Sequence, residues 1–146
     1  MIEETFTAYD VRAKLQDGAS LEFAWNVGRA LAEWLPTSGS IAIMRGEAAD
    51  EHLYSAVVEG VRLQGRDVCD ASGGDKGMLI TLINQVGHSG GVLVGHDQLT
   101  QEVTIELYRE DGQLIDSDHG LQEIETSMKA GNFVPAAIKG DLTALA

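Results

Sequence analysis

Cysteine is nearly absent from the sequence. Cys69 is the single one, so no intramolecular disulfide can form. It lies between Val68 and Asp70 in a segment typical of a strand, where a thiol behaves as a small apolar side chain. A domain without disulfides is typical of a reducing compartment, and we therefore expect a cytoplasmic protein.

Long hydrophobic runs are absent as well. No stretch approaches the roughly 20 consecutive apolar residues that cross a bilayer. The first residues, Met1-Ile2-Glu3-Glu4, lack the basic segment followed by an apolar run that a secretory signal requires. We expect a soluble protein that has no membrane partner.

Positive charge is scarce. The sequence has 10 Lys and Arg residues against 23 Asp and Glu residues, so its formal net charge is −13. Binding to nucleic acid depends on clusters of cations that displace the counterions of the phosphate backbone. The sequence has no such cluster, and we expect no nucleic-acid partner. An anionic sugar phosphate could be attracted only locally, by individual cations.

Proline is rare, with 2 residues, whereas glycine is common, with 17. Together with a hydrophobic content of 44%, this composition is typical of a compact α/β protein with many tight turns. A chain of 146 residues is long enough for one domain with a core of its own. We expect this domain to span residues 1–132 and residues 133–146, where hydrophobic periodicity is weak, to form a tail or connector.

Short apolar segments alternate with helical patterns along the chain. The predicted strands are 41–44, 67–71, 92–94 and 103–107, and the predicted helices are 20–35, 51–64, 78–86 and a last one from Ser117 or Asp118 to Gly131. This alternation with short loops predicts a three-layer α/β/α domain with a mixed, mostly parallel sheet. A tight turn at Glu110-Asp111-Gly112 predicts an antiparallel hairpin at one edge. Ser20 and Asp50 are candidate N-caps, and Gly65 suits the position after a helix.

Residues 90–100 form the centre of this arrangement. Val92, Leu93 and Val94 are a continuous apolar run bounded by glycines, which is typical of a strand covered on both faces. Open α/β sheets place their binding sites at the carboxyl ends of such strands. We therefore expect the functional site around His96 and Asp97.

Several segments, in order and spacing, resemble the amino-terminal domain of the α-D-phosphohexomutase family, the phosphoglucomutases and phosphomannomutases. The resemblance covers about residues 5 to 132 and depends on several short motifs together. Phe6 to Arg12 resembles the opening F-x-A-Y-D-I-R-G, Phe23 to Leu31 the helix A-x-x-I-G-R-A-x-A, Ile41 to Arg45 the strand V-x-V-G-R-D, Ala56 to Gly65 the helix A-x-x-x-G-L-x-x-x-G, Gly90 to Val94 the strand G-G-V-M-I-T, and Leu107 to Gly112 the segment K-L-Y-x-x-D-G.

The resemblance fails at the catalytic loop. The family's strand ends in T-A-S-H-N-P, whose serine carries the phosphoryl group, whereas the same positions here read Gly95-His96-Asp97-Gln98-Leu99-Thr100. Asp97 thus stands at the phosphoserine position and is not expected to act as a nucleophile. Its carboxylate could imitate the phosphoserine and pair with Arg12, or it could stabilise the following turn. We favour the turn.

Arg12, Arg45 and His96 are the candidate phosphate- or anion-binding residues. The two arginines resemble active-site arginines of the family, and they would be functional if they converge on Asp97; otherwise they are solvated surface charges. The turn Ser72-Gly73-Gly74 could cradle a phosphate at the next helix or be a plain turn between strand and helix. His88 and His96 match no metal-binding spacing, so we predict no metal site.

Phosphoryl transfer depends on a carrier, a metal ion and cationic side chains. The resemblance implies magnesium, but the family's ligand loop lies in later domains, and we expect no cofactor in this chain. We therefore predict a phosphohexomutase-like pseudoenzyme associated with hexose-phosphate metabolism, inactive by itself. Its partners would be a weakly bound sugar phosphate and the missing domains of a larger mutase. The alternative is a non-catalytic binding or regulatory module that forms a homodimer.

Overall fold

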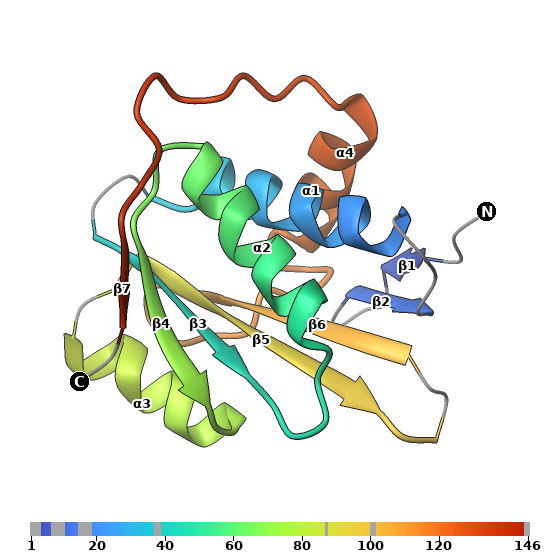
Figure 1. Cartoon of the computed structure of the whole chain (residues 1–146), viewed down its shortest axis with the longest axis vertical. Coiled ribbons are helices and arrows are strands. Elements are labelled where there is room, and N and C mark those ends of the chain that lie inside the picture. Colours follow the sequence, from blue (N-terminus) through green and yellow to red (C-terminus); the bar gives the residue numbers. More distant parts are fainter. Residues whose placement is uncertain are drawn as a thin grey trace.

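A computed structural model describes residues 4–6, 11–14, 19–36, 39–86, 88–99 and 102–144. Within these residues, seven strands form one sheet in the order β1-β2-β6-β5-β3-β4-β7 (Figure 1). The strands are β1 (Glu4–Phe6), β2 (Val11–Lys14), β3 (Ile41–Arg45), β4 (Val68–Gly73), β5 (Gly90–Asp97), β6 (Glu102–Arg109) and β7 (Leu142–Ala144). The helices are α1 (Ala19–Trp34), α2 (Glu51–Leu63), α3 (Lys76–Val86) and α4 (Leu121–Ala130).

The sheet is mixed, as predicted. β5, β3, β4 and β7 run parallel to one another, whereas β6, β2 and β1 extend the sheet from β5 by antiparallel pairing. The turn expected at Glu110-Asp111-Gly112 is present, with Gly112 at φ 82 and its amide donating to the carbonyl of Arg109. After this turn the chain pairs with β6 through one isolated bridge, between Leu114 and Tyr108. The described residues between β6 and α4 form no further strand.

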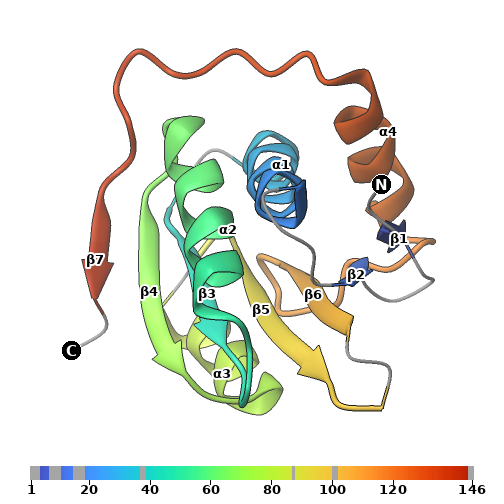
Figure 2. The same ribbon diagram turned by 45° about the vertical axis from the view of Figure 1, so that its right-hand side comes forward.

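Helices cover both faces of the sheet, which confirms the predicted three layers. Figures 1 and 2 show α3 on the opposite side of the sheet from α1 and α2. Ile43 and Val94 pack with α1, α2 and α4 in one core cluster, and Met44 and Leu93 pack with α3 in a second. Because β3 and β5 are covered on both faces, each contains a continuous apolar run, Ile41–Met44 in β3 and Val92–Val94 in β5.

Four local predictions about helix ends have different outcomes. Asp50 caps α2, since its carboxylate accepts the amide of Leu53 at 2.9 Å, and Gly65 follows the helix at φ 81. The N-cap prediction for Ser20 is wrong, because α1 begins at Ala19. The last helix begins at Leu121, later than predicted, because Asp116 accepts the amide of Asp118 and holds the preceding residues in turns.

Residues 131–141, called the strap below, run from α4 across the ends of α1 and α2 to β7 (Figure 1). The strap has no regular structure, but its backbone is hydrogen-bonded to the end of α2, with the amide of Ala136 donating to Leu63 and that of Gly140 donating to Arg62. β7 then pairs with β4. The division of the chain at residue 132 stays a prediction.

None of the helices in the described residues combines the length and apolar character that crossing a membrane would need.

Candidate functional site

The carboxyl ends of β3, β4 and β5 meet at one edge of the sheet because the three strands are parallel. Arg45, the last residue of β3, lies opposite Val94 of β5 and Gly73 of β4. Asp97 is the last residue of β5. The strand ends singled out from the sequence are therefore neighbours, at the edge where open α/β sheets bind their ligands.

A cavity of about 710 Å³ opens at this edge between the β3–α2 loop and the β4–α3 loop. We call it the carboxyl-edge pocket. Its charged lining residues are Arg45, Glu47, Glu51 and Asp75. Three carboxylates therefore oppose a single cation, and an anionic ligand gains little net attraction there.

Both loops at the carboxyl-edge pocket hold residues in a sparsely populated conformation. Ala48, before α2, and Ser72, near the end of β4, have φ 62, in the left-handed region that side chains rarely adopt. Such residues cost on the order of 1–3 kcal/mol each and cluster at functional sites. Gly74 is also constrained, because a Cβ there would lie 2.7 Å from the sulfur of Met44.

Tyr54 of α2 contacts the ends of β3 and β4 beside the carboxyl-edge pocket. The pairing of β3 with β4 shifts after Ile43, so that Ala71 is an extra residue in β4. The Tyr54 hydroxyl reaches this bulge and lies 2.7 Å from the carbonyl oxygen of Ile43 and 2.5 Å from Oδ1 of Asp70. Asp70 also accepts the amide of Ser72 at 2.9 Å, which holds the left-handed turn. Burial, and next the Asp70 carboxylate, raise the pKa of Tyr54, so the hydroxyl stays protonated.

Asp97 makes the contact that the turn interpretation requires. Its Oδ1 accepts the amide of Leu99 at 2.9 Å, in an Asx-type turn directly after β5. Across the hairpin, Asp97 lies opposite Glu102 of β6, a second acid. An anion at Asp97 would therefore meet two carboxylates.

The three candidate anion-binding residues lie on three different strands, Arg12 on β2, Arg45 on β3 and His96 on β5. Arg12 is opposite Thr104 of β6, which is opposite Gly95, so Arg12 lies two strands from β5 at the level of Gly95. Side chains alternate along a strand, so the register puts Arg45 and His96 on one face of the sheet and Asp97 on the other. A shared anion site formed by these residues stays a prediction.

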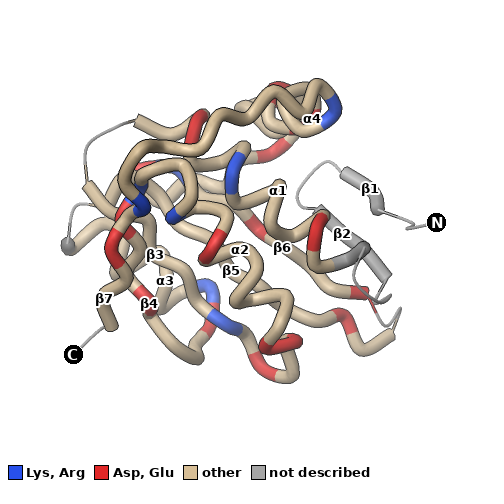
Figure 3. The backbone as a smooth tube through the Cα atoms, turned by 45° about the horizontal axis from the view of Figure 1, so that its top comes forward, with Lys and Arg blue, Asp and Glu red and all other residues tan. Residues whose placement is uncertain are grey.

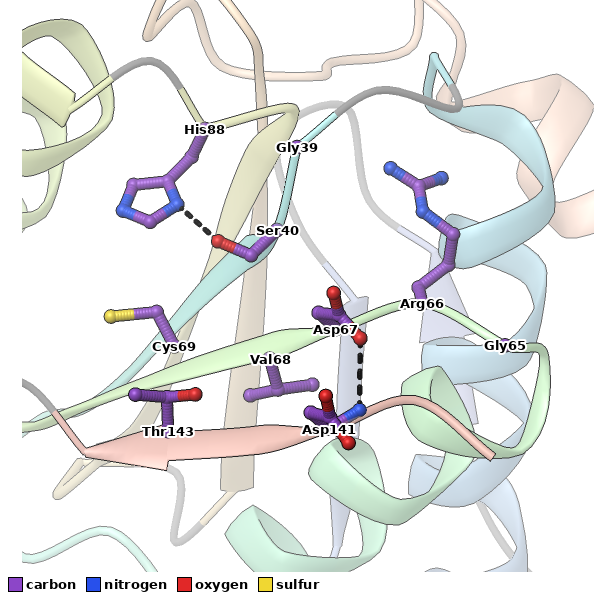
Figure 4. Close-up of a pocket in the computed structure, with 10 residues that line it drawn as sticks. All are labelled: Gly39, Ser40, Gly65, Arg66, Asp67, Val68, Cys69, His88, Asp141 and Thr143. Carbon is purple, nitrogen blue, oxygen red and sulfur yellow. Dashed lines mark hydrogen bonds between the residues drawn. The ribbon is translucent and has the colours of Figure 1, made fainter. Parts of the chain in front are cut away.

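A second cavity, of about 520 Å³, lies at the opposite, amino edge of β3, β4 and β7 (Figure 4). Ser40 Oγ is 2.7 Å from Nδ1 of His88, and the two side chains point toward each other from the residues before β3 and β5. His88 is buried, and its Nε2 has no hydrogen-bond partner among the described residues. From the sequence, His88 was considered only as a metal ligand. Its contact with Ser40 joins residues 48 apart, and no local pattern indicates it.

Stability is expected to fall below about pH 6.5 because of His88. Burial lowers the pKa of His88 from its ordinary 6.5, opposed by a hydrogen bond to the Ser40 backbone. Between the two pKa values the unfolded chain binds a proton that the folded chain does not, so the free energy of unfolding decreases as pH falls, by at most about 1.4 kcal/mol per pH unit.

Denaturant titrations of the parent and of His88→Gln, at about pH 7.5 and about pH 5.5, measure this contribution. The parent is expected to lose more stability on acidification than His88→Gln. His52→Gln, at an exposed position of α2, is the control and should keep the full loss. Equal losses in the parent and in His88→Gln would contradict the prediction.

No group of three His, Cys, Asp or Glu side chains suited to a metal ion is found within the described part of the chain. The carboxylates that line the carboxyl-edge pocket thus do not gather into a ready-made set of metal ligands.

No protein-family model matches the sequence. Curated phosphomannomutases are similar to it: that of Salmonella typhimurium strain LT2 is 28% identical over 131 residues, which are 89% of this chain and 29% of the Salmonella protein. The phosphomannomutase of Escherichia coli K12 has the same identity and coverage. A phosphomannomutase of Klebsiella pneumoniae is 28% identical over 134 residues, which are 83% of that protein.

Solved structures show the same fold. A phosphoglucomutase/phosphomannomutase family protein of Burkholderia thailandensis superposes with a TM-score of 0.75 at 18% identity, over 96% of this chain and 32% of that one. A putative phosphomannomutase of Thermus thermophilus gives 0.70 at 15% identity, over 99% and 34%. These similarities confirm the resemblance to the amino-terminal part of phosphohexomutases and the α/β fold class. The chain spans 29% of the length of the Salmonella and E. coli K12 relatives.

Proposed function

We propose that this chain is a cytoplasmic phosphohexomutase-like domain of hexose-phosphate metabolism that has no mutase activity by itself. The contact of Asp97 with Leu99 is the main support. At the end of β5, where the resemblance places a phosphoryl-carrying serine, the chain has a carboxylate that already accepts a backbone amide. Asp97 has no hydroxyl to phosphorylate, and an acyl phosphate there would need a metal ion to neutralise its charge.

The charges at the carboxyl-edge pocket also support the proposal. Phosphoryl transfer is catalysed by positioning and by neutralising the charge of the phosphoryl oxygens. Arg45 supplies one cation, but Glu47, Glu51 and Asp75 line the same cavity. A sugar phosphate would therefore bind weakly, and the metal ligands and further cations would have to come from other domains.

A mutase assay tests the proposal. With mannose 1-phosphate as substrate and a hexose bisphosphate as phosphoryl source, we expect no turnover above background from the unmodified chain. We expect the same from Asp97→Ser, because the serine alone supplies neither the metal site nor the cations. Turnover by the unmodified chain would contradict the proposal.

A chimera separates a missing nucleophile from missing domains. Replacing the amino-terminal domain of E. coli phosphomannomutase with this chain would add the domains that the chain does not match. We expect the chimera to be inactive and the chimera with Asp97→Ser to be at least about tenfold more active, since only the variant has a hydroxyl nucleophile. Asp97→Asn is the matched control, because it removes the charge without adding a nucleophile.

The second candidate function is a non-catalytic module that binds or regulates through self-association. It is favoured by one observation, the nearly uncharged outer face of α3.

A further inference from the structure

α3 has an outer strip in which Met78, Thr81 and Gln85 are exposed and Leu82 is partly buried against the core. The helix packs on the sheet through Leu79 and Ile83, which are fully buried. On its outer side a shallow groove of about 540 Å³ is lined by Asp75, Gly77, Met78, Thr81, Leu82 and Gln85. The last four, at positions i, i+3, i+4 and i+7, form the α3 strip, and this spacing is that of a helix–helix contact. Met78 is 54% exposed.

The α3 strip is nearly free of charge in a strongly acidic chain. The 11 residues of α3 include one charged side chain, Lys76, at the first position. By comparison, α2 and α4 carry both acidic and basic residues, and Figure 3 shows acidic positions over much of the remaining backbone. With a net charge of −13, two copies repel each other at most surfaces. Because α3 has a single charged side chain, a contact between α3 and α3 adds little to this repulsion.

We propose that the α3 strip packs against the same strip of a second copy, in an antiparallel pair of helices about a two-fold axis. Such an interface is self-complementary, with Thr81 and Leu82 near the axis and Met78 opposite Gln85 of the partner copy. Gly77 and Thr81 are small enough to let the helix axes approach within about 8–10 Å.

The two ends of α3 complement each other in this arrangement. The last turn of α3 has no basic residue of its own. In an antiparallel pair, Lys76 lies near the carboxyl end of the partner copy's helix, where a cation is stabilised by the helix dipole. The negative charge of Asp75 would also lie near the carboxyl end of the partner copy's helix. Its Oδ1, however, already accepts the amide of Met78 in its own helix. The termini therefore favour the antiparallel over the parallel arrangement.

The interface would adjoin the carboxyl-edge pocket. Asp75 and Met78 line both that pocket and the groove along α3. A partner copy seated on the α3 strip would thus lie beside the pocket and change its access. This inference does not depend on phosphoryl chemistry, so the mutase assays and the association experiment can fail separately.

Sedimentation velocity of the full chain tests the proposal. Over about 5 to 500 µM protein, we expect a reversible monomer–dimer equilibrium of micromolar affinity. The dimer is expected to be stronger at about 0.3 M than at about 0.05 M salt, because salt screens the repulsion between the two acidic copies. A monomer at every concentration and both salt levels would overturn the proposal.

A charge placed in the strip locates the interface. Thr81→Lys puts two ammonium groups beside each other near the two-fold axis, and we expect it to weaken the dimer at least about tenfold. Thr126→Lys, at an exposed position of α4, makes the same substitution and the same change in net charge away from the interface, and it should not weaken the dimer. Circular dichroism shows whether both variants fold. A dimer that Thr81→Lys leaves intact, or that both variants weaken equally, would place the contact elsewhere and overturn the proposal.

Discussion

Replacing Gly60 with alanine is expected to lower the free energy of unfolding by about 3 kcal/mol, near the upper end of the cost of overpacking a core. Gly60 lies in α2, where it faces the backbone of α1. A Cβ at this position would lie 2.1 Å from the carbonyl oxygen of Trp25, which as a backbone atom cannot rotate away. Alanine gains about 1 kcal/mol over glycine in a helix, which is too little to offset the clash.

Gly28 makes the reciprocal contact from α1. A Cβ there would lie 2.4 Å from the carbonyl oxygen of Val57. The two glycines thus let the helices approach backbone to backbone, which sets how both rest on the sheet. An alanine at either position forces the helices apart and opens the core beneath them, where dispersion contacts are lost.

Denaturant unfolding followed by circular dichroism, at a protein concentration below the range of the proposed dimer, measures the loss, with Gly77→Ala as the matched control. The nearest atom to a Cβ at Gly77 of α3 is Oδ1 of Asp75 at 3.5 Å, an ordinary contact. The control should therefore leave stability unchanged or slightly raised. If Gly60→Ala unfolds at the same denaturant concentration as the parent, the close approach of α1 and α2 is incorrect.

Replacing Arg66 with methionine is expected to lower the free energy of unfolding by about 3 kcal/mol as well. The guanidinium donates hydrogen bonds to carbonyls at the end of α1, and the last carbonyls of a helix have no partner within the helix. Nη1 of Arg66 donates to Ala32 at 2.8 Å and to Leu35 at 3.3 Å, and Nη2 donates to Pro36 at 2.5 Å. Methionine keeps the apolar stem and removes all three donors.

The position of Arg66 explains why the effect is large. Arg66 is 8% exposed, so water replaces the lost donors poorly. Burial lowers the pKa of the guanidinium, opposed by the neighbouring Asp67, but an arginine remains charged. The last turn of α1 contains no basic residue, so Arg66, from the segment before β4, supplies the charge that stabilises the carboxyl end of the helix.

The midpoint of thermal unfolding is expected to fall by about 10 °C in Arg66→Met. Lys129→Met, which removes one charge from an exposed pair with Glu125 at 3.4 Å, is the control and should change the midpoint little. Equal midpoints for Arg66→Met and the parent would show that the carbonyls of α1 find other partners.

Much of the fold was predictable from local patterns. The run Val92-Leu93-Val94 predicted a strand covered on both faces, and all three residues are buried there, in contact with different helices on the two sides. Asp50 and Gly65 marked the ends of α2 because capping depends only on residues within one turn. The start of α4 was predicted too early, since the helical period extends into residues that Asp116 holds in turns.

The candidate site was predictable in position but not in arrangement. The end of β5 follows from the glycine-bounded run, and the contact of Asp97 with Leu99 is local. The hydrogen bond between Tyr54 and Asp70 joins residues 16 apart, on α2 and β4, and no sequence pattern indicates it. The cavity behind Ser40 and His88 was missed for the same reason.

The amino-acid sequence by itself determined the order of the four central strands and the four helices, the turn after β5 and the carboxylate in place of a serine at position 97, because each depends on residues close together in the chain. Only the tertiary structure decided that Gly28 and Gly60 meet, that Arg66 completes α1, and that β7 joins β4 through backbone pairing. These contacts join segments far apart in the chain through backbone groups common to all residues, so their partners are not encoded in any local pattern.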